Sequence, residues 1–285
     1  MQDRTVRIAL AQLDGTLGAV RANADRARAA AAEAGAGGAD LVVFPELYLS
    51  GYALGEIAHE TAYTAADTSA LVALEPDAPA MLLGFHERCG DQTYNSAAYF
   101  ERGRVLHVHR KLHLVDYTPF DEDRLYAPGH ELRAFTSAAG RVATLICNDC
   151  WHPALPFLAV QDGAAVLLVP SCSSTEFSNV DDYWTALTRF YARMLQCYVV
   201  FVNRVGVEGP FTFWGGSHVV DPRGEIVAAA PHSEEAITVA DIDLRLVAEE
   251  RARLPLTRRP RFELIRTELD RLARSRPIEK DLDRW

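Results

Sequence analysis

The sequence contains no apolar run of the roughly 18 consecutive residues that a membrane-spanning helix requires. Its first residues, MQDRTVRIALAQL, also lack the basic start and the small-residue cleavage site of a secretion signal, and Arg7 interrupts their apolar part. We therefore expect a cytoplasmic protein whose function does not involve a membrane.

Cysteine is scarce and its number is odd. A secreted disulfide framework generally uses an even number of cysteines in a short chain, whereas this chain has 285 residues. We therefore expect free thiols, at least one of which is reactive. The five cysteines are Cys89, Cys147, Cys150, Cys172 and Cys197.

Basic residues are fewer than acidic ones, 29 against 39, which gives a formal net charge of −10. Such a charge repels the phosphates of nucleic acids and of anionic bilayers, so nucleic acid is not an expected partner. The chain also lacks internal repeats and low-complexity linkers, while 49% of its residues are hydrophobic. Together these features predict one domain over residues 1–285 with a well-filled core.

Short apolar segments rich in Val, Leu and Ile alternate with helical patterns, which favours an α/β fold with helices covering the sheets. A hairpin is indicated where the turn sequence Asp221-Pro222-Arg223-Gly224 separates two apolar stretches. The predicted helices cover residues 20–34 and 184–197, and a charged helical tail covers 260–276. The predicted strands are 6–10, 41–44, 81–85, 97–100, 105–108, 142–147, 165–169 and 198–203.

Three reactive side chains follow predicted strands: Glu46, Lys111 and Cys147. Ligands bind at the carboxyl ends of strands in α/β folds, so these three residues could converge there. Each one alone has an ordinary structural explanation. Glu46 could cap a helix, Lys111 could be a solvated surface charge, and Cys147 could be a small buried hydrophobic residue.

The segments around these residues, FPEL, HRKLHL and LICNDCWHP, resemble in the same order the three signature segments of the nitrilase superfamily of carbon-nitrogen hydrolases. The segments SGY, YNSA, PFDEDRLYAPG, NRVG and FWGGSHVVDPRG are also similar, so the resemblance covers about residues 5–245 and leaves 246–285 as a tail. It implies a four-layer α-β-β-α sandwich that forms homodimers or higher homo-oligomers, with the tail at an oligomer interface.

The resemblance implies that Cys147 attacks a non-peptide carbon-nitrogen bond and forms a thioester. A thiol needs a base or a nearby cation to become nucleophilic at neutral pH, and Glu46 and Lys111 would supply these. Lys111 and the backbone N–H of Asn148 would stabilise the developing negative charge. Glu122 matches the family's second glutamate, which orients the lysine and the substrate. No metal or organic cofactor is expected.

The substrate pocket is expected to draw on residues near the matched segments. Phe211, Phe213 and Trp214 form an aromatic cluster that we interpret as packing rather than as a binding surface. The candidate substrate-binding residues are Tyr52, His113, Tyr117, Asn148, Trp151, Cys172 and Trp184.

The substrate stays open among several classes. A small amide is favoured over a nitrile because Asn148-Asp149 replaces the aromatic-glutamate step that often follows a nitrilase cysteine. An N-carbamoyl amine or amino acid is an alternative. PFDEDR with ICNDCWHP also resembles the glutaminase domains of NAD synthetases, although the chain ends before an ATP-dependent synthetase domain, so a free-standing glutaminase subunit is another alternative.

Other functions of the same residues also remain possible interpretations of the sequence. Cys147 and Cys150 form a C-x-x-C pair that is typical of redox proteins, and with His152 they could supply three zinc ligands. His113 could pair with Cys147 as a nucleophile-base couple. A binding module without turnover is the last alternative, because a fold alone does not establish activity.

Overall fold

Two six-stranded sheets form the centre of the protein, which a computed structural model describes over residues 5–176 and 178–275. The first sheet has the order β14 (Ala236–Asp243), β1 (Thr5–Gln12), β2 (Leu41–Val43), β3 (Ala80–Cys89), β4 (Gln92–Glu101) and β5 (Arg104–Arg110). The second has the order β13 (Ile226–Ala229), β12 (His218–Val220), β9 (Tyr198–Asn203), β8 (Val166–Ser171), β7 (Gly140–Thr144) and β6 (Phe135–Ser137).

Both sheets are mixed. Strands β1, β2 and β3 run parallel to one another, as do β7, β8 and β9, and every other pair in the two sheets is antiparallel. A separate hairpin consists of β10 (Val205–Glu208) and β11 (Phe211–Trp214). The parallel strands β2, β8 and β9 are wholly buried, which explains their continuous apolar sequences.

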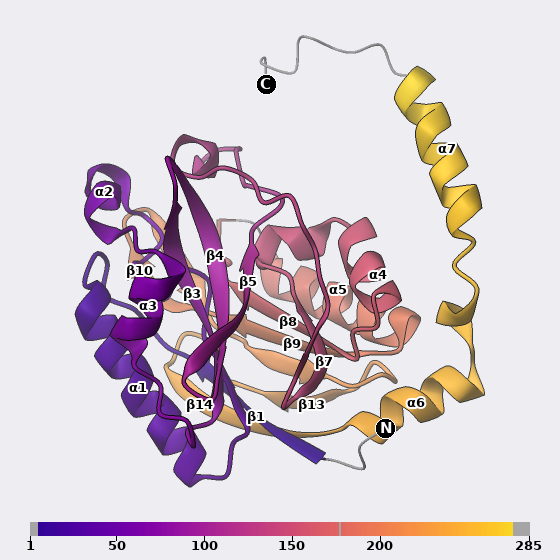
Figure 1. The fold of residues 1–285 in the computed structure, drawn as a ribbon, viewed down its shortest axis with the longest axis horizontal. Helices are drawn as coiled ribbons and strands as arrows, with labels where there is room; N and C mark the ends of the chain where they lie inside the picture. The colour runs from indigo at the N-terminus through magenta and orange to yellow at the C-terminus, as the bar shows by residue number, and fades with distance from the viewer. Residues whose placement is uncertain (1–4, 177, 276–285) are drawn as a thin grey trace.

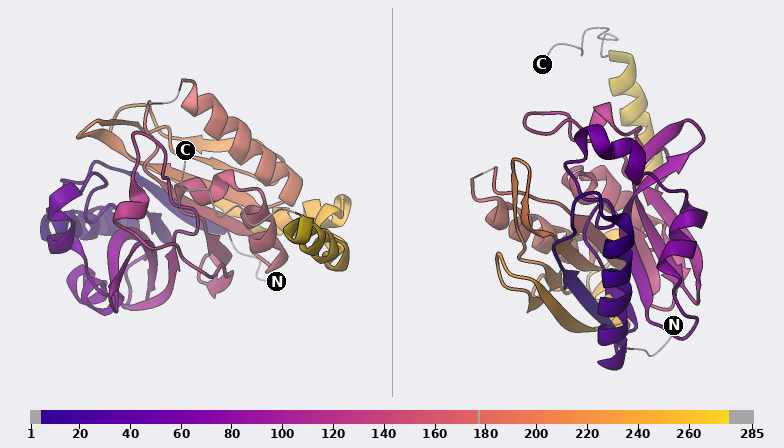
Figure 2. Two further views of the ribbon diagram at one scale, coloured as in Figure 1. Left: turned by 90° about the horizontal axis from the view of Figure 1, so that it is seen from above. Right: turned by 90° about the vertical axis from the view of Figure 1, so that its left-hand side faces the viewer.

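Alternate side chains of each strand are buried on opposite faces of its sheet, and this produces four layers. Ile8 and Leu82 of the first sheet pack with Leu168 and Val200 of the second in one core between the sheets. The opposite face of the first sheet is covered by α1 (Val20–Ala36) and α3 (Ala65–Val72), and that of the second by α4 (Ala154–Gln161) and α5 (Val180–Leu195). Figures 1 and 2 show this arrangement, and the predicted α-β-β-α sandwich is confirmed.

The shorter helical elements lie in the connections and near the C-terminus. Among the described residues, no helix has both the length and the apolar character needed to cross a bilayer. The elements are η1 (Gly55–Ile57), α2 (Ala58–Thr61), η2 (Glu122–Arg124), η3 (Cys147–Trp151), α6 (Leu244–Arg253), η4 (Leu256–Arg258) and α7 (Phe262–Ser275).

All eight predicted strands are present, and all but 198–203, which coincides with β9, have shifted ends. The difference that matters most for the site is in the predicted strand 142–147. Strand β7 ends at Thr144, because Cys147 has a positive φ of 44° and begins η3. Helix α5 begins four residues before the predicted position 184. The predicted turn is confirmed, since the Gly224 N–H donates to the Asp221 carbonyl at 2.8 Å between β12 and β13.

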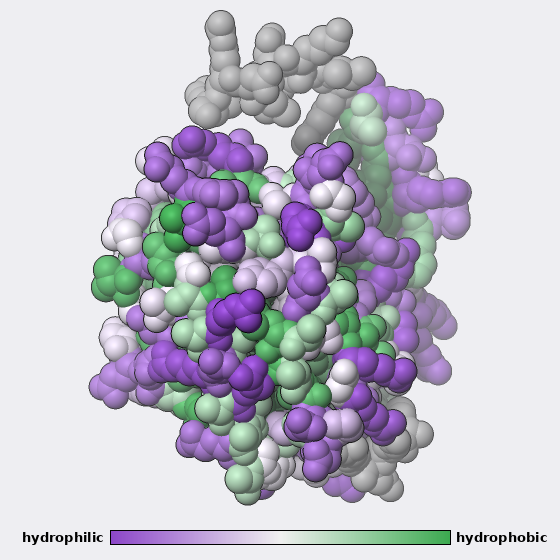
Figure 3. Space-filling model, turned by 60° about the vertical axis from the view of Figure 1, so that its left-hand side comes forward, coloured by the Kyte–Doolittle hydropathy of each residue, from purple (hydrophilic) through white to green (hydrophobic). Residues whose placement is uncertain are grey.

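Helix α7 corresponds to the predicted tail, of which residue 276 lies outside the described residues. It extends away from the four layers in Figure 1, and all of its residues are exposed. In Figure 3 it stands as a separate column beside the body. One contact with the body joins the rings of Phe262 and Phe157 of α4, whose centroids are 6.4 Å apart.

Candidate active site

Glu46, Lys111 and Cys147 each lie in a connection that leaves a strand. Glu46 follows β2 and Lys111 follows β5 in the first sheet, and Cys147 follows β7 in the second. The ends of the two stacked sheets therefore bring together residues that are 65 and 36 positions apart in the sequence (Glu46 to Lys111, and Lys111 to Cys147).

One ammonium joins two carboxylates at the floor of the site. Lys111 Nζ donates to Glu46 Oε1 at 2.7 Å and to Glu122 Oε1 at 2.7 Å. The three side chains are buried, with exposures of 0%, 0% and 3%. Burial alone would lower the pKa of Lys111, but Glu122 and Glu46 outweigh it and raise that pKa well above its ordinary value. Lys111 is therefore a fixed positive charge at neutral pH.

Glu46 is held by two further donors. Its Oε1 accepts from Asn95 Nδ2 at 2.7 Å, and its Oε2 accepts from the Cys172 N–H at 2.8 Å. The backbone behind it approaches Gly84 so closely that a methyl group there would lie 2.3 Å from Leu47 N. The glycine therefore permits the loop that carries Glu46 to lie on β3.

Glu122 is positioned from both sides. Its Oε1 also accepts from the Tyr52 hydroxyl at 2.6 Å, and its Oε2 accepts from the Val115 N–H at 3.1 Å. Burial raises the pKa of Glu122, Lys111 opposes this, and Glu46 adds to it, with a net pKa above the ordinary value. Glu122 thus holds Lys111 in a position fixed by the backbone at Val115.

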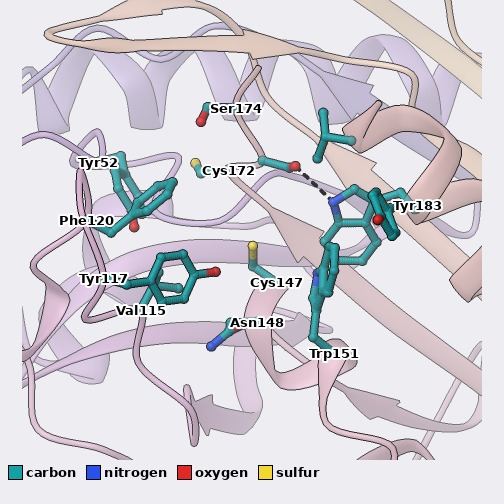
Figure 4. Close-up of a pocket in the computed structure, with 13 residues that line it drawn as sticks. Tyr52, Val115, Tyr117, Phe120, Cys147, Asn148, Trp151, Cys172, Ser174 and Tyr183 are labelled. Carbon is teal, nitrogen blue, oxygen red and sulfur yellow. Dashed lines mark hydrogen bonds between the residues drawn. The ribbon is translucent and has the colours of Figure 1, made fainter. Parts of the chain in front are cut away.

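Cys147 occupies a sharp change of chain direction. Its φ of 44° is unusual for a residue with a side chain and costs about 1–3 kcal/mol, which the surrounding structure must offset. The sulfur faces the cavity between Tyr117 and Trp151 in Figure 4, and Cys147 is one of the residues that line this cavity. The strained turn therefore presents the thiol to a ligand.

The thiol of Cys147 is not a thiolate at neutral pH. Burial raises its pKa, Glu46 and Glu122 raise it further, and Lys111 lowers it without overcoming these effects, so that the pKa lies well above the ordinary value. Lys111 acts in the expected direction but does not ionise the thiol. Removal of the thiol proton therefore has to accompany attack on a substrate.

A buried aspartate links the Lys111 segment to the Cys147 turn. Asp149 Oδ1 accepts from the N–H groups of Leu112 and His113, both at 2.9 Å. Its Oδ2 interacts with His109 Nε2 at 2.9 Å and accepts from the Ile146 N–H at 3.1 Å. One carboxylate thus fixes two loops from different sheets relative to each other.

A cavity of about 360 Å³ opens above Cys147 and is shown in Figure 4. The structure places six of the seven predicted substrate-binding residues on its lining: Tyr52, Tyr117, Asn148, Trp151, Cys172 and Trp184. The sequence analysis missed the other lining residues, Val115, Phe120, Ser173, Ser174, Val180 and Tyr183. Most of these lie beyond the matched segments, and only Phe120, inside PFDEDR, carried a signal that could have identified it.

His113 is the predicted pocket residue that does not line this cavity. Its ring stacks on His152 with centroids 3.5 Å apart, and its N–H is held by Asp149. The reason is that the strand β5 ends at Arg110, so the alternation that placed His113 on the same face as Lys111 does not continue.

The aromatic cluster packs as interpreted. Phe211 and Phe213 are buried with Tyr52 and Phe120 in one core cluster, and Trp214 is buried under α5. None of the three lines the cavity above Cys147. They support the wall of the site from behind.

The structure gives no support to the redox and zinc alternatives. All five cysteines are free, and Cys150 is wholly buried in the core beneath α4 and α5. Over residues 5–176 and 178–275, no group of three or more His, Cys, Asp or Glu side chains is arranged to hold a metal ion.

Comparisons with known proteins identify the family of the chain. The family model described as carbon-nitrogen hydrolase matches residues 7–252. The glutamine-dependent NAD(+) synthetase of Thermotoga maritima is 32% identical over 251 residues, which are 85% of this chain and 42% of the synthetase. The chain therefore spans less than half the length of that relative.

Two solved structures cover nearly the whole of both chains. A carbon-nitrogen hydrolase from Helicobacter pylori G27 is 27% identical with a TM-score of 0.81, over 93% of this chain and 99% of that one. A mutant of the amidase from Nesterenkonia sp. AN1 is 25% identical with a TM-score of 0.77, over 92% and 96%. The latter shows covalent addition of the acetamide moiety of fluoroacetamide at the active-site cysteine.

Proposed function

Because the chain belongs to the carbon-nitrogen hydrolase family and hydrolyses non-peptide carbon-nitrogen bonds, we propose that its substrate is a small amide. The amide is converted to a carboxylic acid and ammonia through a thioester on Cys147. The observation that supports this most is the buried Glu46-Lys111-Glu122 cluster beside the Cys147 thiol at the base of a cavity.

In the first half-reaction Glu46 accepts the thiol proton while the Cys147 sulfur bonds to the amide carbon. The carbonyl oxygen becomes negative, and Lys111 Nζ and the Asn148 N–H stabilise it. The tetrahedral adduct collapses as Glu46 returns its proton to the amide nitrogen, and ammonia leaves. The raised pKa of the thiol supports this coupled transfer, since no thiolate exists beforehand.

In the second half-reaction water replaces ammonia and Glu46 removes a proton from it. The resulting hydroxide attacks the thioester carbon, the C–S bond breaks, and the proton on Glu46 returns to the Cys147 sulfur. The product is the carboxylic acid. Glu122 acts by holding Lys111 at 2.7 Å, so that the ammonium stays aimed at the oxyanion in both steps.

This function is tested by ammonia release from short primary amides by the wild-type chain and by Cys147→Ala. We expect turnover in the wild type and none in the variant, whose circular dichroism spectrum should be unchanged. Turnover retained by a folded Cys147→Ala protein would contradict the proposal.

A free-standing glutaminase-type subunit is the second candidate. It is favoured by the match to the Thermotoga synthetase over 85% of this chain. Glutamine should therefore stand in the same amide series, beside an N-carbamoyl amine and a nitrile. The ratios of kcat/KM among these substrates distinguish the candidates.

We propose that the protein forms a homodimer through α4, α5 and α7, with residues 5–245 as the domain core and 246–285 as an interface tail. This is supported by exposed apolar side chains on all three helices, including Leu158, Phe190 and Leu269. Light scattering after size-exclusion chromatography tests it. Phe190→Glu should give a monomer, whereas Leu17→Glu, at an exposed apolar site elsewhere, should not.

We also propose a cytoplasmic location, supported by the five free cysteines, because thiols persist in reducing compartments. Cell fractionation of the source organism with an antibody to the chain tests this location.

A further inference from the structure

Over the part of the chain that the structure describes, the lining of the cavity above Cys147 carries no ionisable group other than thiols and phenols. Among its described residues there is no Asp, Glu, Lys, Arg or His. Six of its thirteen lining residues are aromatic, which favours apolar ligands held by a few neutral polar groups. The thirteen residues are Tyr52, Val115, Tyr117, Phe120, Cys147, Asn148, Trp151, Cys172, Ser173, Ser174, Val180, Tyr183 and Trp184.

Two aromatic walls face each other across the sulfur in Figure 4. On one side Tyr52 meets Phe120 edge to face, with centroids 6.1 Å apart. On the other Trp151 meets Trp184 edge to face at 5.6 Å and lies 6.0 Å from Tyr183. These contacts hold the rings in place, so the space between them is a preformed slot for a flat or extended apolar group.

Several polar atoms in the walls already bind protein groups. The Tyr52 hydroxyl donates to Glu122, and Trp184 Nε1 donates to Ser173 Oγ at 2.9 Å. The Asn148 amide donates to the carbonyls of His113 and Leu114 at 3.2 and 3.4 Å. Ser174 Oγ, which is buried and has no hydrogen-bond partner among the described residues, is left for a ligand, and the rest of the wall surface is mainly carbon.

The buried charged groups nearest to Cys147 are paired with one another. Glu46, Lys111 and Glu122 form the buried cluster described above, in which both ion-pair distances are 2.7 Å. Asp116, between the lining residues Val115 and Tyr117 in sequence, does not itself line the cavity. Asp181 and Asp182 lie between the lining residues Val180 and Tyr183 in sequence, but neither lines the cavity. A ligand's ammonium or carboxylate would thus lose water without gaining an ion pair on this lining.

Resting on the proposed function, we infer that the substrate is the primary amide of an uncharged, apolar carboxylic acid, with an alkyl or aryl acyl group between the two aromatic walls. An amino acid amide such as glutamine, which carries an ammonium and a carboxylate, does not fit this lining. The chain then differs in substrate from the glutamine-dependent synthetases whose sequences it resembles.

The experiment measures kcat/KM for matched amides: pentanamide and phenylacetamide as neutral substrates, glutaramic acid as an anion, 5-aminopentanamide as a cation, and glutamine. We expect both neutral amides to exceed each charged one by at least about tenfold. A charged amide that equals or exceeds the neutral ones overturns the inference and leaves the proposed function intact. Release of ammonia from none of them overturns both.

A wall variant gives a second readout. Trp151 is 40% exposed, so Trp151→Ala should fold. It should lower the kcat/KM ratio of phenylacetamide to propionamide by at least about fivefold, mainly through KM, because an aromatic contact is lost only for the larger acyl group. The ratio does not depend on the folded fraction. Leu158→Ala, an exposed apolar residue on α4, is the control and should leave the ratio unchanged. An unchanged ratio in Trp151→Ala would contradict the slot.

Discussion

The Nζ atom of Lys111 lies 2.7 Å from Oε1 of Glu46, and both side chains are wholly buried. A buried pair of this kind contributes little net stability, because desolvation of the charges offsets their attraction. The pair is better explained by its place beside the Cys147 thiol. There the carboxylate can exchange a proton while the ammonium remains charged.

Replacing Lys111 by Met should impair both activity and stability. The variant leaves Glu46 and Glu122 buried without their shared cation, which should cost about 3–5 kcal/mol in the free energy of unfolding. Loss of the oxyanion's ammonium should lower kcat at least about 100-fold. Urea denaturation and steady-state kinetics measure the two effects.

Arg124→Met is the matched control for this change. Arg124 pairs with Asp121 at 3.2 Å in the same connection, but both side chains are exposed. Its loss should cost less than about 1 kcal/mol and leave kcat unchanged. Equal effects of the two substitutions would mean that the Lys111 pair has no special role.

The pH dependence of kcat/KM should reflect the two shifted ionisations around Lys111. The pKa of Glu122 is raised by burial, so the carboxylate is lost on acidification at a higher pH than an ordinary glutamate, and the acidic fall in activity should lie at correspondingly higher pH. The pKa of Lys111 is also raised, so its charge persists as the pH rises and causes no alkaline loss below about pH 10.

The variant Glu122→Gln isolates the acidic limb. Removing this ionisation should move the limb to lower pH, even though the maximal rate also falls. An acidic limb at the same pH in the variant would assign it to another group.

Asp149→Asn should loosen the link between the Lys111 segment and the Cys147 turn. The amide group would face the Ile146 N–H and His109, which now interact with a carboxylate oxygen. Leaving these groups unsatisfied should cost about 1–3 kcal/mol, and the displaced turn should lower kcat. Asp241→Asn, at an exposed pair with Arg7, should do neither. Thermal unfolding and steady-state kinetics measure the two effects. A wild-type rate in Asp149→Asn would contradict the role of Asp149 in positioning the Cys147 turn.

Much of the site was predictable because its residues lie in short segments that end strands. FPEL, HRKLHL and LICNDCWHP located Glu46, Lys111 and Cys147, of which the first two are joined by a hydrogen bond and the third lines the cavity. Asp149, in contrast, was not identified as a site residue, although it lies inside the segment that carries Cys147. Its four interactions join residues 109–113 to 146, and such long-range pairing has no signal in the spacing of a single sequence.

Abrupt changes in chain direction were the second feature that the sequence did not predict. The continuous apolar pattern through residues 142–147 predicted a strand up to Cys147, but a positive φ at a non-glycine residue leaves no trace in such a pattern. The β10–β11 hairpin was missed for a related reason. Its aromatic residues alternate over only four positions, and its partner strand is equally short.

Gly84→Ala should disturb Glu46 without touching any reactive group. A methyl group there would lie 2.3 Å from Leu47 N and 2.5 Å from the Pro45 carbonyl oxygen, so the loop must shift. A displacement of this size should lower kcat/KM at least about tenfold. At Gly90 a methyl group meets nothing within 4 Å, so Gly90→Ala should keep full activity despite its φ of +60°. Equal activity of both variants would count against the close packing behind Glu46.

Acid-quenched mass spectrometry during turnover of a slowly hydrolysed amide examines the thioester most directly. The account predicts a mass increase equal to the acyl group, located on the peptide that contains Cys147 and lost when the substrate is exhausted. An acyl group on any other residue, or turnover by Cys147→Ser at the wild-type rate, would contradict it.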